Sequence, residues 1–147
     1  MSSEERSGSR NPEDMTWEDI EVGRECEPFE YRVTEERVRK YLDALGIENP
    51  WYTEGSPFGG PIVPALISKS DAATHDWWYP FTSRPGFLHT RSEFEFINPL
   101  KVGKRVRVKG RWAEKYKKRG RDWAAIEAVA VDEDGLEIVR SRTTHTV

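Results

Sequence analysis

The stretch "LHTRSEFEFINPLKVGKRVRV", residues 88–108, decides the fold class of this chain. Apolar and polar residues alternate along residues 89–99 and again from residue 104, with a turn-like "NPLKVGK" between the two runs. Two further runs of strand length follow at residues 121–132 and 136–147, separated by short turns rich in Lys, Asp and Gly. We therefore expect four consecutive strands in hairpin order, which is an antiparallel meander with one buried and one solvated face.

The part of the chain before the meander predicts one strand and two helices. "PFEYRV", residues 28–33, alternates as a short strand does. Thr34 is a helix N-cap and Gly46 a helix stop, with an apolar stripe at helical spacing between them. A second helix is expected over residues 64–79, where apolar residues on several sides indicate burial. Together these elements predict an α+β domain in which the buried helix packs against a strongly curved sheet.

Length and charge limit the class of protein. A chain of 147 residues suits one domain, which we place at residues 14–147, after a polar tail at residues 1–13. Its 23 basic residues are interleaved with 26 acidic ones, so no nucleic-acid footprint is present. The absence of a long apolar run predicts a cytoplasmic protein that does not enter a membrane. With the single cysteine Cys26, we expect no disulfide and no metal site.

Three segments taken in order carry a family resemblance. "FGGPIVPALI" at residues 58–67, residues 88–108, and "KKRGRDWAAIEAVAVDEDG" at residues 117–135 resemble the MaoC-like acyl dehydratase and (R)-specific enoyl-CoA hydratase family. The chain looks most like the N-terminal, dehydratase-like half of double-hot-dog hydratases. The resemblance implies a single hot-dog domain, with a long central helix wrapped by a curved antiparallel sheet. It also implies an acyl-CoA thioester as ligand, with coenzyme A as part of the substrate and no separate cofactor. The implied reaction belongs to fatty-acid or steroid side-chain metabolism.

The loop before the second helix departs from the family pattern. Active members carry Asp-x-Asn-Pro-x-His there, and this chain has "IENPWY", residues 47–52. Ile47 stands in the Asp position and Tyr52 in the His position. Isoleucine transfers no proton, and a tyrosine hydroxyl with a reference pKa of about 10 is a poor base at neutral pH. Shifting the register by one residue offers Glu48 and still no imidazole. The usual catalytic pair is therefore expected to be missing.

Other side chains are candidates for the missing groups. Among the histidines, His89 at the start of the first meander strand is the best remaining imidazole; His75 is more typical of a helix surface, and His145 of a structural or exposed residue. A relocated set would combine His89 or His75 with Glu48 or Asp76.

The binding side of the site is expected at the start of the second helix. Backbone amides there polarise the thioester carbonyl in the family, and Ala65 stands where relatives often have Gly. We expect Asn49, Tyr52, Gly60, Ala65 and Trp77 to contact the acyl ligand. The basic "KYKKRG", residues 115–120, is more typical of a solvated hairpin tip than of a coenzyme A phosphate site.

These observations leave three hypotheses. The chain is an acyl-CoA-binding subunit that works as a heteromer with a catalytic MaoC-like chain; or it is a homodimeric hydratase with a relocated acid/base set; or it is a hot-dog protein that binds a small ligand without catalysis. Each of the first two requires at least a dimer.

Overall fold

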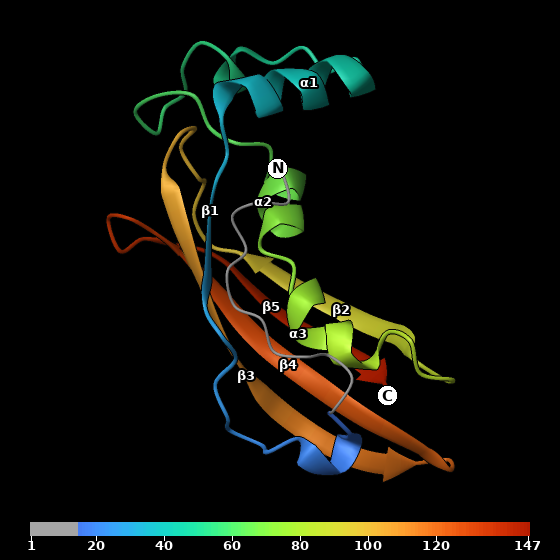
Figure 1. Ribbon diagram of the computed structural model, residues 1–147. Helices are drawn as coiled ribbons and strands as arrows, with labels where there is room; N and C mark the ends of the chain where they lie inside the picture. The colour runs from blue at the N-terminus through green and yellow to red at the C-terminus, as the bar shows by residue number, and fades with distance from the viewer. Residues whose placement is uncertain (1–14) are drawn as a thin grey trace.

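A curved five-stranded antiparallel sheet with helices against one face forms the domain, as the computed structural model of residues 15–147 shows (Figure 1). The sheet order is β1-β3-β4-β5-β2. The strands are β1 (Phe29–Arg32), β2 (Leu88–Phe96), β3 (Arg105–Lys118), β4 (Arg121–Asp132) and β5 (Glu137–Thr146). The predicted α+β class is confirmed, and the tail predicted at residues 1–13 lies outside the described residues.

The helices are α1 (Glu35–Leu45), α2 (Ala65–Asp71) and α3 (His75–Trp78), with 3-10 turns at Trp17–Asp19, Pro50–Tyr52 and Tyr79–Phe81. The α1 helix has the predicted ends. Its N-cap Thr34 accepts a hydrogen bond from the amide of Arg37 at 3.2 Å, and Gly46 ends it in the left-handed conformation with φ of 64°. Within residues 15–147, no helix has the length and apolarity needed to cross a lipid bilayer.

The strand pairing differs from the predicted meander. β3, β4 and β5 follow one another in hairpin order, but β2 pairs with β5 at the far edge and not with β3. The connecting residues 97–104 run past the start of α2, where the carbonyl of Leu100 accepts a hydrogen bond from the amide of Val63 at 2.7 Å. The prediction of four strands in hairpin order was wrong because alternation defines a strand without defining its neighbour.

The helix predicted over residues 64–79 is also not continuous. It is divided into α2 and α3 by residues 72–74. Thr74 is buried, with its hydroxyl 3.3 Å from the hydroxyl of Thr143 on β5. The Thr143 hydroxyl also accepts a hydrogen bond from the Trp78 indole at 3.0 Å. The apolar residues of this segment lie on several sides of an ideal helix. Breaking it lets both halves bury their apolar residues along a curved sheet (Figure 1).

The core has two clusters on the helix side of the sheet. The first lies under α1 and α2, and the second lies under α3 near the first residues of the domain. The first contains Val33, Val38, Leu42, Val63, Ile67, Leu100, Val106, Val108, Ile138 and Val139; the second contains Ile20, Cys26, Trp78, Phe81, Trp112, Ala124 and Ile126. Trp77 packs against both clusters. On β3, the predicted solvent face of Arg105, Arg107, Lys109 and Arg111 is confirmed as exposed.

The close contact between Trp77 and Gly110 of β3 gives a stability prediction. A Cβ atom at Gly110 would lie 2.4 Å from the Trp77 ring and 2.7 Å from the carbonyl oxygen of Glu127. Gly110→Ala should therefore lower the free energy of unfolding by about 1–3 kcal/mol, as overpacking does in other cores. Urea unfolding measures the change. Gly55→Ala is the control, because nothing lies within 4 Å of its Cβ position; equal stability of the two variants would contradict the packing.

Candidate active site

A groove of about 260 Å³ opens at the start of α2. Its walls come from the 3-10 turn before α2, from α2 itself, from the end of β2 with the residues that follow it, and from β5. The lining residues are Tyr52, Ile62, Val63, Ala65, Ser68, Phe96, Ile97, Asn98, Pro99, Leu100 and Ile138. Most of these side chains are apolar, so the groove suits a hydrocarbon chain.

Backbone hydrogen bonds hold the groove open between two segments distant in sequence. The amide of Val63 donates to Leu100 at 2.7 Å, and the amide of Val102 donates to Pro61 at 3.0 Å. The side-chain amide of Asn98 donates to the carbonyl of Glu137 at 2.9 Å. Main-chain hydrogen bonds, together with that of the Asn98 side chain, therefore fix the shape of the groove.

Unpaired backbone donors lie at one end of the groove. The carbonyl of Pro64 accepts from the amides of Ile67 and Ser68, at 2.9 and 3.3 Å. In residues 15–147, the amides of Ala65 and Leu66 have no such carbonyl acceptor, as is usual in the first turn of a helix. These two N–H groups are suited to a carbonyl oxygen of a ligand.

The groove lacks groups that transfer protons at neutral pH. Its polar side chains are the hydroxyls of Tyr52 and Ser68 and the amide of Asn98, and no carboxylate or imidazole is among the described residues that line it. Ser68 is 2% exposed and Tyr52 is half-buried. The groove of one chain can therefore bind and orient a ligand, but it holds no general base.

Ile47 and Glu48 lie outside the groove. Ile47 follows the end of α1, where its amide donates to Leu42 at 3.0 Å, and both side chains are exposed. The oxygen of the Asn49 side chain accepts from the amide of Trp51 at 3.0 Å, which caps the 3-10 turn that carries Tyr52. The carbonyl of Gly60 accepts from the Ser56 hydroxyl at 2.5 Å. Of this loop's predicted ligand contacts, only Tyr52 lines the groove.

Ala65 joins Tyr52 in the groove, whereas Trp77 does not. The Trp77 indole donates to the carbonyl of Glu27 at 2.8 Å and packs edge-on against Phe29, with ring centroids 5.6 Å apart. Trp77 and Trp78 both pack in the core of the domain, and a contact of Trp77 with the acyl ligand stays a prediction.

The three histidines gather far from the groove, at the other end of β2. The ring of His89 lies 4.5 Å from that of His145, which is buried and stacked between Trp78 and Phe87, with centroids 4.0 and 4.9 Å away. His75 begins α3 and is exposed, and His89 is exposed as well. Seven residue steps along β2 separate His89 from Phe96 at the groove, which is about 23 Å. No histidine can therefore act in the groove of its own chain.

Burial sets the charge state of two groups. Desolvation, with the charges of His89 and His75 as smaller causes, lowers the pKa of His145 to about 4. The ring is therefore neutral at physiological pH, and its Nδ1 atom has no hydrogen-bond partner in residues 15–147. Burial raises the pKa of Cys26 to about 12, so it stays a thiol and is no nucleophile. Residues 15–147 contain no group of His, Cys, Asp or Glu side chains placed to hold a metal ion.

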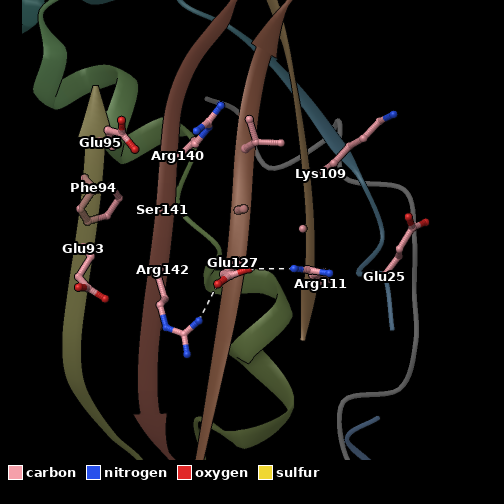
Figure 2. A pocket seen from close by; sticks show the side chains of 13 residues that line it. Glu25, Glu93, Phe94, Glu95, Lys109, Arg111, Glu127, Arg140, Ser141 and Arg142 are labelled. Carbon is pink, nitrogen blue, oxygen red and sulfur yellow. Dashed lines mark hydrogen bonds and ion pairs between the residues drawn. The ribbon is translucent and has the colours of Figure 1, made fainter. Parts of the chain in front are cut away.

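A larger hollow of about 570 Å³ lies on the opposite face of the sheet, which the helices leave uncovered (Figure 2). Four acidic and four basic side chains line it: Glu25, Glu93, Glu95, Glu127, Lys109, Arg111, Arg140 and Arg142. They alternate in charge across the strands, and Glu127 pairs with Arg142 at 2.6 Å and with Arg111 at 3.3 Å. An acyl chain there would have to displace water from these charges, so we place the ligand site in the smaller groove.

The basic hairpin tip is separate from both hollows. Lys115 and Lys117 stack over the Trp17 ring at 4.6 and 4.5 Å, and Lys117 also pairs with Asp122 at 2.8 Å. The tip lies at the end of the sheet opposite the start of α2 (Figure 1).

Of the eleven residues that line the groove, sequence reasoning predicted Tyr52 and Ala65 and missed the other nine. Residues 96–100 were read as the end of a strand and a turn, and Ser68 as a residue of a buried helix. Their position depends on the crossing of residues 97–104 past α2, for which the sequence offers no local signal. The prolines on both sides, Pro61 and Pro99, mark the two segments only as irregular.

Comparison with known proteins agrees with this fold. A family model described as FAS1-like, dehydratase domain region, matches residues 21–140. The fold is similar to that of the MaoC-like dehydratase from Rhodospirillum rubrum, with a TM-score of 0.72, 16% identity, and coverage of 88% of this chain and 94% of that one. It is also similar to the (R)-hydratase PhaJ1 from Pseudomonas aeruginosa, with a TM-score of 0.69, 16% identity, and coverage of 89% and 84%.

A chain of the ChsH1–ChsH2 complex from Mycobacterium tuberculosis is a third structural relative, with a TM-score of 0.62, 10% identity, and coverage of 86% of this chain and 97% of that one. At such identities the likeness shows the fold alone, and the predicted hot-dog fold is confirmed. No curated protein matches the chain significantly.

Because His145 is buried, the free energy of unfolding should depend on pH. Its pKa of about 4 in the folded chain lies below the ordinary value of 6.5, so the unfolded chain binds more protons between these pH values. Stability should therefore fall as the pH is lowered from neutral toward 4.5, with about 2 kcal/mol due to this residue. Urea unfolding at several pH values should show a smaller pH slope for His145→Leu than for the exposed control His75→Gln. Equal slopes would show that His145 does not titrate in this way.

Proposed function

The chain belongs to the FAS1-like dehydratase domain region family and has the hot-dog fold of the MaoC-like dehydratases, and from this we propose that it is an acyl-thioester-binding subunit of an enoyl-CoA hydratase or dehydratase. Its proton-transfer groups come from a second chain. One observation carries the proposal: the groove at α2 combines apolar walls and unpaired amides with an absence, among its described lining residues, of carboxylates and imidazoles.

The chemistry divides into binding and proton transfer. Adding water to a 2-enoyl thioester requires donors to the thioester oxygen, a base for the water and an acid for the α-carbon. In this chain, the apolar walls hold the acyl group, and the amides of Ala65 and Leu66 are donors for the carbonyl oxygen. Coenzyme A enters as part of the substrate. The base and the acid are the groups that the groove does not contain.

Two kinds of second chain satisfy this requirement. One is a MaoC-like chain that carries the Asp and His absent at Ile47 and Tyr52, as a heteromer; a structural relative of this chain is itself part of a complex of two named chains, ChsH1 and ChsH2. The other is a second copy of this chain, whose histidines lie at the opposite end of the sheet. A hot-dog protein that binds a small ligand without catalysis is the outcome if neither gives turnover.

Ligand binding can be tested by blocking the groove. Thermal unfolding with crotonyl-CoA and decenoyl-CoA should show a rise in Tm for the natural chain, because a ligand at about 100 times its Kd stabilises a protein by about 2.7 kcal/mol. Ala65→Phe fills the groove from an exposed position and should abolish the rise.

Ala44→Phe is the matched control, since Ala44 is exposed on α1 outside the groove and this variant should keep the full rise in Tm. If the natural chain shows no shift with any 2-enoyl-CoA at saturating concentration, the proposed function is refuted. If Ala65→Phe shifts as much as Ala44→Phe, the ligand binds elsewhere.

A further inference from the structure

Ser68 places a hydroxyl in the wall of a groove whose other side chains are mostly apolar. It is 2% exposed and lines the groove together with Ala65, three residues earlier on the same side of α2. The other polar side chains of the groove have partners available in the free chain. Tyr52 is half-buried, so water reaches it, and the side-chain nitrogen of Asn98 donates to the carbonyl of Glu137 at 2.9 Å. Ser68 therefore carries the most enclosed hydroxyl of this groove.

The Ser68 hydroxyl has no hydrogen-bond partner in residues 15–147. A buried serine within a helix commonly donates to the carbonyl four residues earlier. Here that carbonyl, of Pro64, accepts only from the backbone amides of Ile67 and Ser68, at 2.9 and 3.3 Å. An enclosed hydroxyl without a partner costs free energy, and a ligand that supplies the partner removes this cost.

The chemistry of the acyl group decides whether the Ser68 hydroxyl is satisfied. A plain hydrocarbon chain would displace water from the groove and leave this hydroxyl unpaired. An acyl chain with an oxygen at the depth of Ser68 would pair with it, because a hydroxyl both donates and accepts. A site that hydrogen-bonds a hydroxyl of its ligand discriminates against the analogue without that group. The groove is therefore suited to an oxygenated acyl chain.

The place of Ser68 along α2 indicates which carbon bears that oxygen. In the proposed function, the thioester oxygen lies about 3 Å in front of the amides of Ala65 and Leu66. Ser68 is two to three residues further on, about 3–4.5 Å along the helix axis, and its side chain leans back toward the start of the helix. About 6 Å thus separates the thioester oxygen from the Ser68 hydroxyl.

An oxygen on the third carbon of the acyl chain fits this separation. Four covalent bonds connect it to the thioester oxygen, and one hydrogen bond of about 2.8 Å to Ser68 completes the span. The third carbon is also the one that gains or loses oxygen in the proposed function.

We propose that Ser68 determines the acyl specificity of the groove: its hydroxyl holds an oxygen on the third carbon, so the chain binds a 3-hydroxyacyl thioester in preference to a saturated or 2-unsaturated one of equal length. The inference rests on the proposed function and names the substrate class of its groove. Ser68 holds the oxygen and transfers no proton, so the proton transfers remain with the second chain. When water adds to an enoyl group, the water oxygen occupies the same place.

The position of Ser68 on a single wall of the groove adds a stereochemical consequence. The walls that come from β5 and from the end of β2 with the residues after it contribute the apolar side chains of Phe96, Leu100 and Ile138. With the thioester held at one end, the two enantiomers of a 3-hydroxyacyl group direct their hydroxyl to different walls. Only one enantiomer therefore pairs with Ser68.

Matched ligands of four carbons test the proposal. Calorimetric titration of the purified chain compares butyryl-CoA, crotonyl-CoA and the two enantiomers of 3-hydroxybutyryl-CoA. One enantiomer should bind about tenfold more tightly than butyryl-CoA, which is the effect of about one hydrogen bond. In Ser68→Ala this preference should disappear, while the affinity for butyryl-CoA should not weaken, because no partner of the hydroxyl is lost.

Ser70→Ala is the matched control, since Ser70 is exposed on the same helix and lies outside the groove. This variant should keep the preference for one enantiomer. Thermal unfolding without ligand gives a second measurement: the Tm of Ser68→Ala should not fall below that of the natural chain. A lower Tm would show that the hydroxyl has a partner within the protein, and it would overturn the inference.

The remaining outcomes separate this inference from the proposed function. If the natural chain binds all four thioesters equally well, selection by Ser68 is overturned and the proposed function stands. If Ser68→Ala weakens all four equally, Ser68 only shapes the groove, and the inference is again overturned. If the natural chain binds none of them, the proposed function fails as well.

Discussion

The crossing of residues 97–104 past the start of α2 is the constraint on which the rest of this structure depends. Two backbone hydrogen bonds, from Val63 to Leu100 and from Val102 to Pro61, join this crossing to the segment before α2. They fix the position at which the helix begins and close one wall of the groove. They also send the chain from β2 at one edge of the sheet to β3 beside β1 at the other, which leaves β2 without a second neighbour. The groove and the free edge therefore have the same origin.

The two faces of the sheet have different physical roles. The helix face is filled by apolar side chains in two clusters, and the groove opens at the end of the first. The other face has side chains of alternating charge from four strands, which pair with one another across the sheet (Figure 2). Such pairs at the surface contribute little to stability, but they keep the face that the helices leave uncovered hydrated.

Features that depend on residues close together in the sequence were predicted correctly, whereas features that depend on contacts between distant residues were not. The α1 helix begins after Thr34 and ends at Gly46 as predicted, because caps act within one turn. The alternation of β3 predicted its buried and solvated faces correctly. The pairing of β2 and the break at residues 72–74 were not predicted, since they depend on contacts such as that of Thr74 with Thr143, far away in sequence. For the same reason the loop reading found Tyr52 and Ala65 but missed Ser68 and residues 96–100.

The loop that carries Tyr52 keeps its shape in this chain although Ile47 and Tyr52 stand where the resemblance implies an acid and a base. Tyr52 still lines the groove and Asn49 still caps the turn that carries it, so the loop keeps its shape while the imidazole is absent. Ile47 is 36% exposed just beyond α1 and lies outside the groove. A groove with apolar walls and no acid or base among its described lining residues is what the proposed function requires of this chain, because the second chain of that proposal then supplies the proton transfers.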